Sequence, residues 1–134
     1  MRAFFNASED LAPGKAKERR AYVLRDPEQL SFFRRLTISG LPLSVRQAGI
    51  WNDLHQYARL PFYPLEQIKC PALVLHGRAD GNVPFTHADF VTRTVCNVQI
   101  HAIEDCGHLI WVGPGAAQSR ETVLAFLARH VPAA

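Results

Sequence analysis

The feature that most constrains the fold is the stretch 70–108, where two short apolar runs flank a helical pattern. The first run, 72–76, lies between a proline and a glycine, as expected for a strand buried on both faces of a parallel sheet. Residues 84–95 place apolar side chains mostly at helical spacing after an N-terminal proline, and 98–103 is the second run. Parallel strands need a crossover of a dozen or more residues, usually helical. The stretch therefore predicts a parallel β-α-β unit.

Two chemically active residues follow the ends of the predicted strands. Asp80 follows the first strand and His108 follows the second. In open α/β sheets, ligand-handling residues gather at the carboxyl ends of strands. Simpler interpretations exist for both, because D-G-N is ordinary turn chemistry and a loop histidine often bonds only to backbone. We nevertheless expect the two side chains to be close neighbours in space.

The residues around these two positions resemble motifs of the α/β-hydrolases. The sequence HGRADGNVP at 76–84 is similar to the H-G-x-x-D-x-x-V-P loop of that family, and Gly107-His108, followed by an apolar patch and Pro114, is similar to its histidine loop. The triad of that family runs in the order nucleophile, acid, histidine. The resemblance, specific over 68–131, implies that Asp80 orients the imidazole and that His108 is the general base. The expected fold class is α/β, the C-terminal part of an α/β-hydrolase fold.

The chain departs from the family pattern at the nucleophile. No G-x-S-x-G occurs, since Ser39 precedes only a single Gly40, and no H-G-G-G segment is present. We therefore expect the C-terminal portion of a hydrolase, truncated or read from a late start, without its nucleophile half and inactive alone. Two strands would leave a sheet edge and an apolar face uncovered. A missing N-terminal half, a partner chain or a homo-oligomer is expected to cover them.

The first half of the chain has a helical pattern. Pro13-Gly14 predicts a turn, and helices are predicted over 15–24, 27–36 and 44–59. Asp26 suits an N-cap with Gln29 as its reciprocal partner, and Ser44 suits a second helix start of the same kind. We divide the chain into a helical lid-like segment and connector, 1–64, and a partial α/β-hydrolase core with the acid and histidine loops, 65–134.

The resemblance implies that the helical segment is the lid that walls the substrate pocket. The candidate pocket-lining residues are aromatic: Phe33, Trp51, Tyr57 and Trp111. The alternative is that the lid aromatics simply pack the helices together. Residues 109–112 are apolar and suit the back of a pocket, while 116–130 predict a closing helix whose apolar face extends to Val131.

Composition disfavours several other classes of function. The net charge is +3 and the pI is about 9.0. A basic cluster is interrupted by Glu18 and has no interleaved aromatics, so it predicts a solvated helix face and no nucleic-acid site; its members are Lys15, Lys17, Arg19, Arg20 and Arg25. No apolar run reaches the length of a membrane span, and the N-terminus has no signal-peptide pattern.

The cysteines and remaining histidines predict neither disulfides nor a metal. Cys70, Cys96 and Cys106 are odd in number and lack C-x-x-C spacing, which favours reduced thiols and a cytoplasmic protein. Cys106 is expected to be a small buried thiol. The histidines outside the loop lack metal-ligand spacing, so we expect no metal and no cofactor; they are His55, His76, His87, His101 and His130.

The predicted function is that of a serine-type hydrolase acting on a small-molecule carboxylic ester or related substrate. The chemistry of the wider family, on haloalkanes, epoxides or carbon–carbon bonds, stays open because its nucleophile would also lie upstream. The alternative is a non-catalytic binding or interaction module of the same fold, possibly oligomeric.

Overall fold

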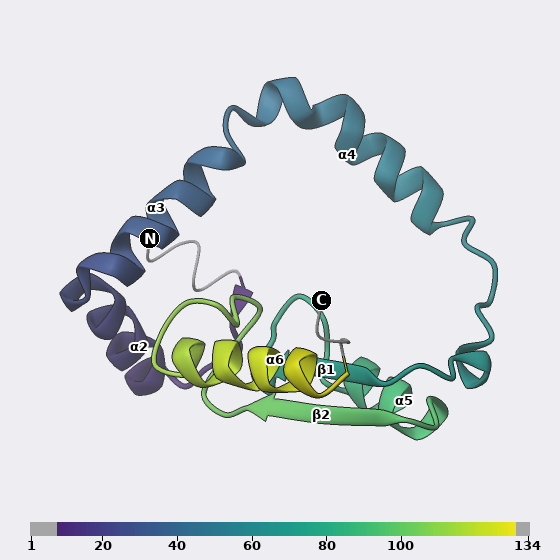
Figure 1. Cartoon of the computed structure of the whole chain (residues 1–134). Coiled ribbons are helices and arrows are strands. Elements are labelled where there is room, and N and C mark those ends of the chain that lie inside the picture. Colours follow the sequence, from purple (N-terminus) through teal and green to yellow (C-terminus); the bar gives the residue numbers. More distant parts are fainter. Residues whose placement is uncertain (1–7, 131–134) are drawn as a thin grey trace.

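The computed structural model describes residues 8–130, and Val131 with the first seven residues of the lid-like segment lies outside them. Helices fill the first half of this range and a small α/β unit the second (Figure 1). The elements in order are α2 (Pro13–Arg25), α3 (Pro27–Ser39), α4 (Leu43–Tyr57), η1 (Leu65–Gln67), β1 (Ala72–Gly77), α5 (Thr86–Thr94), β2 (Val98–Ile103) and α6 (Ala116–His130).

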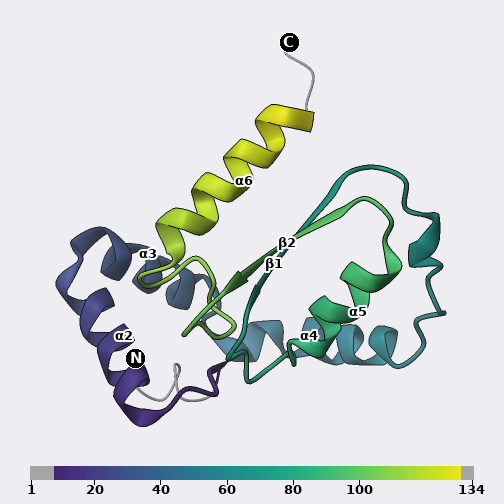
Figure 2. The same cartoon turned by 90° about the horizontal axis from the view of Figure 1, so that it is seen from below.

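The sheet consists of β1 and β2, which pair in parallel. The register runs from Ala72 opposite Val98 to Gly77 opposite Ile103, and α5 is the crossover between the strands. Helices α5 and α6 both pack against the strands, on opposite faces of the sheet (Figures 1 and 2). The predicted β-α-β unit with a closing helix is therefore confirmed.

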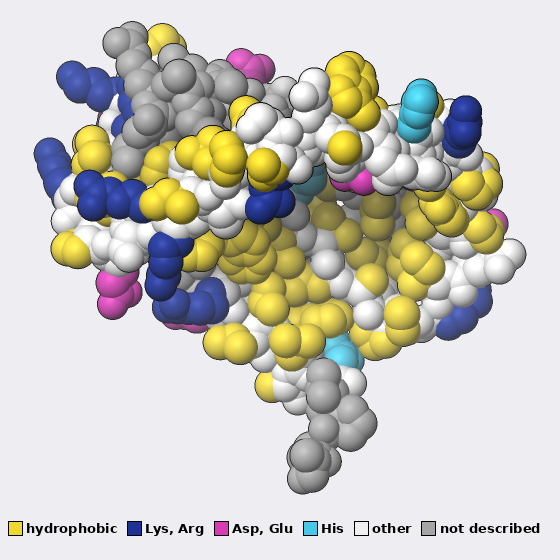
Figure 3. Space-filling view, turned by 90° about the horizontal axis from the view of Figure 1, so that it is seen from above, with side chains coloured by type: hydrophobic (Ala, Val, Ile, Leu, Met, Phe, Trp, Pro, Cys, Tyr) yellow, Lys and Arg dark blue, Asp and Glu magenta, His cyan; other side chains and the backbone are white. Residues whose placement is uncertain are grey.

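The strands are less buried than their apolar sequences predict. Only Gly77 in β1 and Ile103 in β2 are fully buried, and Ile100 is 43% exposed. The prediction of a strand buried on both faces was wrong within the described residues, because two strands and two helices cannot cover both faces completely. Figure 3 shows hydrophobic side chains gathered across the middle of the face seen from above.

The ends of the first helices follow from local chemistry. Asp26 caps α3 by accepting hydrogen bonds from the Glu28 and Gln29 amides, as predicted. Pro13 and Gly14 open α2 instead of forming a turn, because a proline in the first helical turn loses no hydrogen bond. The predicted partner role of the Gln29 side chain was wrong, since its Oε1 accepts from the Gly113 amide at 2.8 Å.

Helix α4 differs from its neighbours in start and in packing. It begins at Leu43 without a side-chain cap, so the predicted Ser44 cap is also wrong. None of its residues is buried, and apart from an exposed hydrogen bond from Arg46 Nη2 to the Ser39 carbonyl of α3 it packs against no other helix or strand of the described chain. It forms the far part of an arch that continues from α2 through α3 and returns to β1 through the connector (Figure 1).

The hydrophobic core lies away from α4, between α2, α3 and the loop after β2. Its centre is Val23, Phe33 and Val112, with Phe32 and Leu109 packed against it. The core therefore joins the first helices directly to the loop that carries His108. No helix in the described range is long and apolar enough to cross a membrane.

Candidate active site

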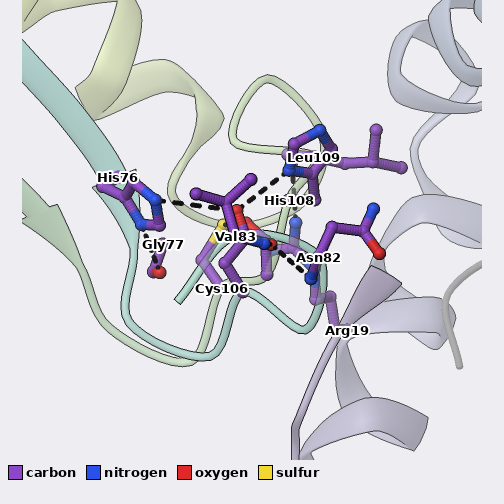
Figure 4. Close-up of polar contacts among 10 residues, drawn as sticks. Arg19, His76, Gly77, Asn82, Val83, Cys106, His108 and Leu109 are labelled. Carbon is purple, nitrogen blue, oxygen red and sulfur yellow. Dashed lines mark hydrogen bonds and ion pairs between the residues drawn. The ribbon is translucent and has the colours of Figure 1, made fainter. Parts of the chain in front are cut away.

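The loops that follow β1 and β2 bring Asp80 and His108 together, and Figure 4 shows the polar contacts around the His108 ring. His108 Nδ1 lies 2.9 Å from Asp80 Oδ2, although the residues are 28 positions apart. An ionised carboxylate can only accept hydrogen bonds, so Nδ1 carries the proton. This tautomer leaves Nε2 with a lone pair, which is the state that a general base requires.

Asp80 is held in its ionised form. Its side chain is 5% exposed, and its Oδ1 accepts from the Asn82 and Val83 amides at 2.8 and 2.9 Å. Burial pushes the pKa of Asp80 upward, but the hydrogen bonds from Val83, His108 and Asn82 outweigh it and hold that pKa below its usual value. The D-G-N turn is thus real, and it orients the carboxylate.

A second imidazole faces the same carboxylate. His76 Nε2 lies 3.8 Å from Asp80 Oδ2, while His76 Nδ1 contacts the Gly77 carbonyl at 2.9 Å. The ring packs edge-on against Phe85. Sequence reasoning treated His76 only as a strand residue, although its position in the H-G-x-x-D motif was a usable signal.

The two loops approach each other closely at Gly77. A Cβ there would overlap the Cys106 and Gly107 carbonyl oxygens. The Arg78 amide donates to the Ile103 carbonyl at 3.0 Å and the Ala79 amide to Cys106 at 2.9 Å, so the parallel pairing continues into the loops. Glycine after His76 therefore permits the approach that joins acid to base.

A short segment before α2 ties both loops together. The Ser8 carbonyl accepts from the His108 amide at 3.1 Å and from the Gly81 amide at 3.3 Å, and the Asp10 amide donates to the Ala79 carbonyl at 2.8 Å. No sequence pattern pointed to this segment. These three hydrogen bonds join backbone atoms only, which a motif search cannot detect.

Arg19 of α2 reaches the histidine loop from the other side. It is buried, and its Nε donates to Glu9 Oε1 at 2.6 Å. Its Nη2 donates to the Leu109 carbonyl at 2.9 Å and also to the Val112 carbonyl. The prediction of a solvated basic face was wrong for Arg19, because its guanidinium finds a carboxylate and two carbonyls inside the protein.

A hollow of about 480 Å³ opens beside the Asp80–His108 pair. Its walls are mainly apolar, with Asp80 and two imidazoles as the polar groups: Leu36, Leu75, His76, Asp80, Val83, His108, Leu109, Ile110, Trp111 and Val112. The stretch 109–112 backs it as expected. Leu36 comes from α3 and was not foreseen as a wall residue.

The predicted aromatic lining residues lie in three different settings. Trp111 lines the hollow. Phe33 packs in the buried core instead. Trp51 and Tyr57 are 61% and 69% exposed on α4 and are not among the residues that line the hollow. A wall role for the two α4 residues stays a prediction that this geometry does not support.

The thiols play no visible part in the site. Cys106 is buried, and burial raises the pKa of its thiol despite the nearby Arg19. Such a thiol is poorly nucleophilic. Cys70 and Cys96 are exposed and unbridged. Among residues 8–130, no group of three or more His, Cys, Asp or Glu side chains could hold a metal ion.

The fold of this chain resembles that of a solved α/β-hydrolase-fold protein. An α/β-hydrolase-fold protein from Nakamurella multipartita superposes with a TM-score of 0.83 at 28% identity, over 94% of this chain and 44% of that one. The described architecture is therefore part of an α/β-hydrolase fold.

Sequence comparison gives the family. Residues 37–133 match the prolyl oligopeptidase family, and the chain belongs to it. An uncharacterized hydrolase from Bacillus subtilis, YcgS, is 33% identical over 79 residues, which are 59% of this chain and 28% of that protein. The human serine hydrolase BPHL is 34% identical over 75 residues, 52% of this chain and 26% of its own length. The matches cover about a quarter of each of these relatives.

Proposed function

We propose that Asp80 and His108 are the acid and the general base of a serine-type hydrolase that cleaves carboxylic esters or related small-molecule substrates. The observation that carries the proposal is the 2.9 Å contact between His108 Nδ1 and the buried Asp80 carboxylate. The His108 side chain is 47% exposed and lines the apolar hollow, so a substrate can reach it. The human relative BPHL, a serine hydrolase, supports the same assignment.

In the proposed reaction, His108 accepts and returns one proton in each of two half-reactions. The serine oxygen bonds to the substrate carbonyl carbon while its proton passes to His108 Nε2. As the carbon–oxygen bond to the leaving group breaks, Nε2 returns that proton to the departing alcohol. A water molecule then repeats the sequence and releases the acid and the serine. Asp80 holds the Nδ1–H tautomer throughout and stabilises the imidazolium.

The nucleophile is not encoded in these 134 residues under this proposal. The sequence has no G-x-S-x-G, and the matches cover only about a quarter of the curated relatives. A serine on an earlier strand would therefore complete the site. The 134-residue chain by itself is proposed to have no meaningful turnover, because the oxyanion-hole amides of a nucleophile elbow are missing with the serine.

The test uses two proteins and one matched pair of variants. The reading frame upstream of the Met1 codon is sequenced, and the extended protein is assayed with an activated ester beside the 134-residue chain. In the extended protein, His108→Ala should lower kcat by roughly 10⁶-fold. The control His55→Ala, on exposed α4, should leave it unchanged.

Two results would contradict the proposal. One is a His108-dependent rate in the 134-residue chain above its own His108→Ala background. The other is an upstream frame without a nucleophile motif, or an extended enzyme indifferent to His108→Ala. The first would mean that the 134-residue chain supplies its own nucleophile, and the second would mean that the Asp80–His108 contact serves structure alone.

The second candidate is a non-catalytic interaction module of the same fold. The exposed apolar side chains of α4 and the connector favour it, among them Leu43, Val45, Trp51, Leu54, Tyr57 and Phe62. In this case the partner would be another chain or a second copy. Light scattering on the purified chain separates the candidates, since a defined oligomer without ester turnover in the extended protein supports the module.

A further inference from the structure

We infer that Arg19 and Glu9 are a positioning pair that sets the His108 ring against Asp80 by holding the histidine loop, residues 106–113, in place. The inference rests on the proposed function, because it takes His108 as the base. Neither residue touches the hollow, so both act through the loop and neither is a catalytic residue.

The contacts of Arg19 form a fork that only a guanidinium can supply. Nε donates to Glu9, and Nη2 donates to two carbonyls of the histidine loop, those of Leu109 and Val112. The Arg19 and Glu9 side chains are 3% and 1% exposed. A planar guanidinium with several fixed donors can bind three acceptors at once, whereas an ammonium acts as a single point charge.

The glycines that flank His108 show how closely the loop packs on this pair. A Cβ on Gly107 would overlap the Glu9 side chain, and a Cβ on Gly113 would lie 2.6 Å from Arg19 Nη1. Gly113 also has a φ of +101°, which favours glycine. Glu9 therefore packs against the loop at one end and Arg19 at the other, with His108 between them.

The backbone around Glu9 carries the same restraint to the acid loop. The single Ser8 carbonyl accepts from the His108 amide and the Gly81 amide, and the Asp10 amide bonds to the Ala79 carbonyl. When Arg19 holds Glu9, it therefore holds the segment that touches both loops. The Ser8 carbonyl thus binds the backbone of His108 itself, whose ring makes the 2.9 Å contact with Asp80.

A buried ion pair is weak evidence for stability, since apolar residues of similar size often stabilise as well or better. Here Arg19 also donates two hydrogen bonds to carbonyls of the histidine loop. A positioning role predicts a change at the His108 ring, and a merely structural role predicts only a change in unfolding.

The test measures the His108 tautomer in the full 134-residue chain by ¹⁵N NMR of the imidazole nitrogens. Wild type should show one neutral tautomer, with the proton on Nδ1. The Arg19→Met chain should lose this preference and show both tautomers in exchange. Asp80→Asn is the positive control, because it removes the carboxylate that selects the tautomer.

Lys15→Met is the matched negative control. Lys15 lies on the same helix and pairs with Asp105 at 2.8 Å, but both side chains are more than half exposed, and Asp105 precedes the loop 106–113. It should leave the His108 spectrum unchanged. A folded Arg19→Met chain with the wild-type tautomer, or an equal effect of Lys15→Met, overturns the inference.

If circular dichroism shows that the Arg19→Met chain does not fold, the His108 tautomer is measured in the Arg19→Lys chain instead. It keeps the charge beside Glu9 but loses the fork, so mixed tautomers are expected, and a wild-type spectrum overturns the inference. These readouts need no turnover. An ester assay that His108→Ala does not affect would contradict the proposed function and leave the NMR result on positioning unchanged. Conversely, a wild-type tautomer in the Arg19 variants would contradict the positioning inference and leave the proposed function unchanged.

Discussion

The junction of α2, α3 and the histidine loop contrasts with α4 and its connector. At the junction, Val23, Phe33 and Val112 are buried and Arg19 is bound inside the protein. In α4 no residue is buried, although its sequence offers tryptophan, tyrosine and several aliphatic side chains. The sequence of α4, LSVRQAGIWNDLHQY, is more apolar than that of α2, PGKAKERRAYVLR. The difference therefore comes from tertiary packing, which places one region on the loops of the site and leaves the other without a partner.

This contrast separates α2 and α3 from α4, although the sequence predicts one lid-like segment, 1–64, for all three. Helices α2 and α3 belong structurally with the histidine loop, through the core and the Gln29–Gly113 and Arg19 hydrogen bonds. The boundary at residue 64 stays a prediction, but these contacts cross it. The Asp80–His108 geometry is thus expected to depend on α2 and α3 and to be independent of α4.

The largest difference in stability is expected between alanine substitutions of one aromatic residue in each region. Phe33→Ala empties part of the buried core, which should lower the free energy of unfolding by about 3–5 kcal/mol. Trp51→Ala removes a 61% exposed side chain on α4 and should change it by less than about 0.5 kcal/mol. Urea denaturation of the 134-residue chain checks both.

A large loss with Trp51→Ala would break the comparison. It would mean that α4 packs on the rest of the protein in solution. Trp51 would then regain its place as a candidate wall residue of the pocket.

A second test uses the glycine beside Arg19. Gly113→Ala forces a side chain into the left-handed region and against a guanidinium that three acceptors hold in place. We expect a loss of about 1–3 kcal/mol in the free energy of unfolding. The control Gly14→Ala has open space around its Cβ and should cause no loss. Equal midpoints for wild type and Gly113→Ala would show that the loop can move away from Arg19.

The smallest effect concerns α4 alone. Gly49 lies in the helix interior with open space around it, so Gly49→Ala should stabilise the helix by about 0.5–1 kcal/mol. Because α4 buries none of its residues against the rest of the described chain, the gain should appear as higher helix content by circular dichroism, with an unchanged midpoint of global unfolding. A raised global midpoint would show that α4 unfolds together with the core.

The sequence was informative where chemistry and periodicity act locally. The β-α-β unit followed from two apolar runs around a helical pattern, and Asp80 and His108 followed from short motifs at the strand ends. Arg19 could not be found in this way, because a basic residue in a charged helix looks solvated until its distant acceptors are known. The positions of Phe33 and Trp51 depend equally on contacts between elements, so hydrophobic spacing on a helix could not distinguish core from surface.

The Ser8 carbonyl, which accepts from one amide in each loop, has a practical consequence for shortening this protein. A version begun at Pro13 would keep every letter of both recognisable motifs and would pass any signature search. It would also lack the Ser8 oxygen, which accepts a hydrogen bond from an amide in each of the two loops. Trimming the domain at the motif boundaries would therefore remove a backbone contact to both loops that no sequence motif marks.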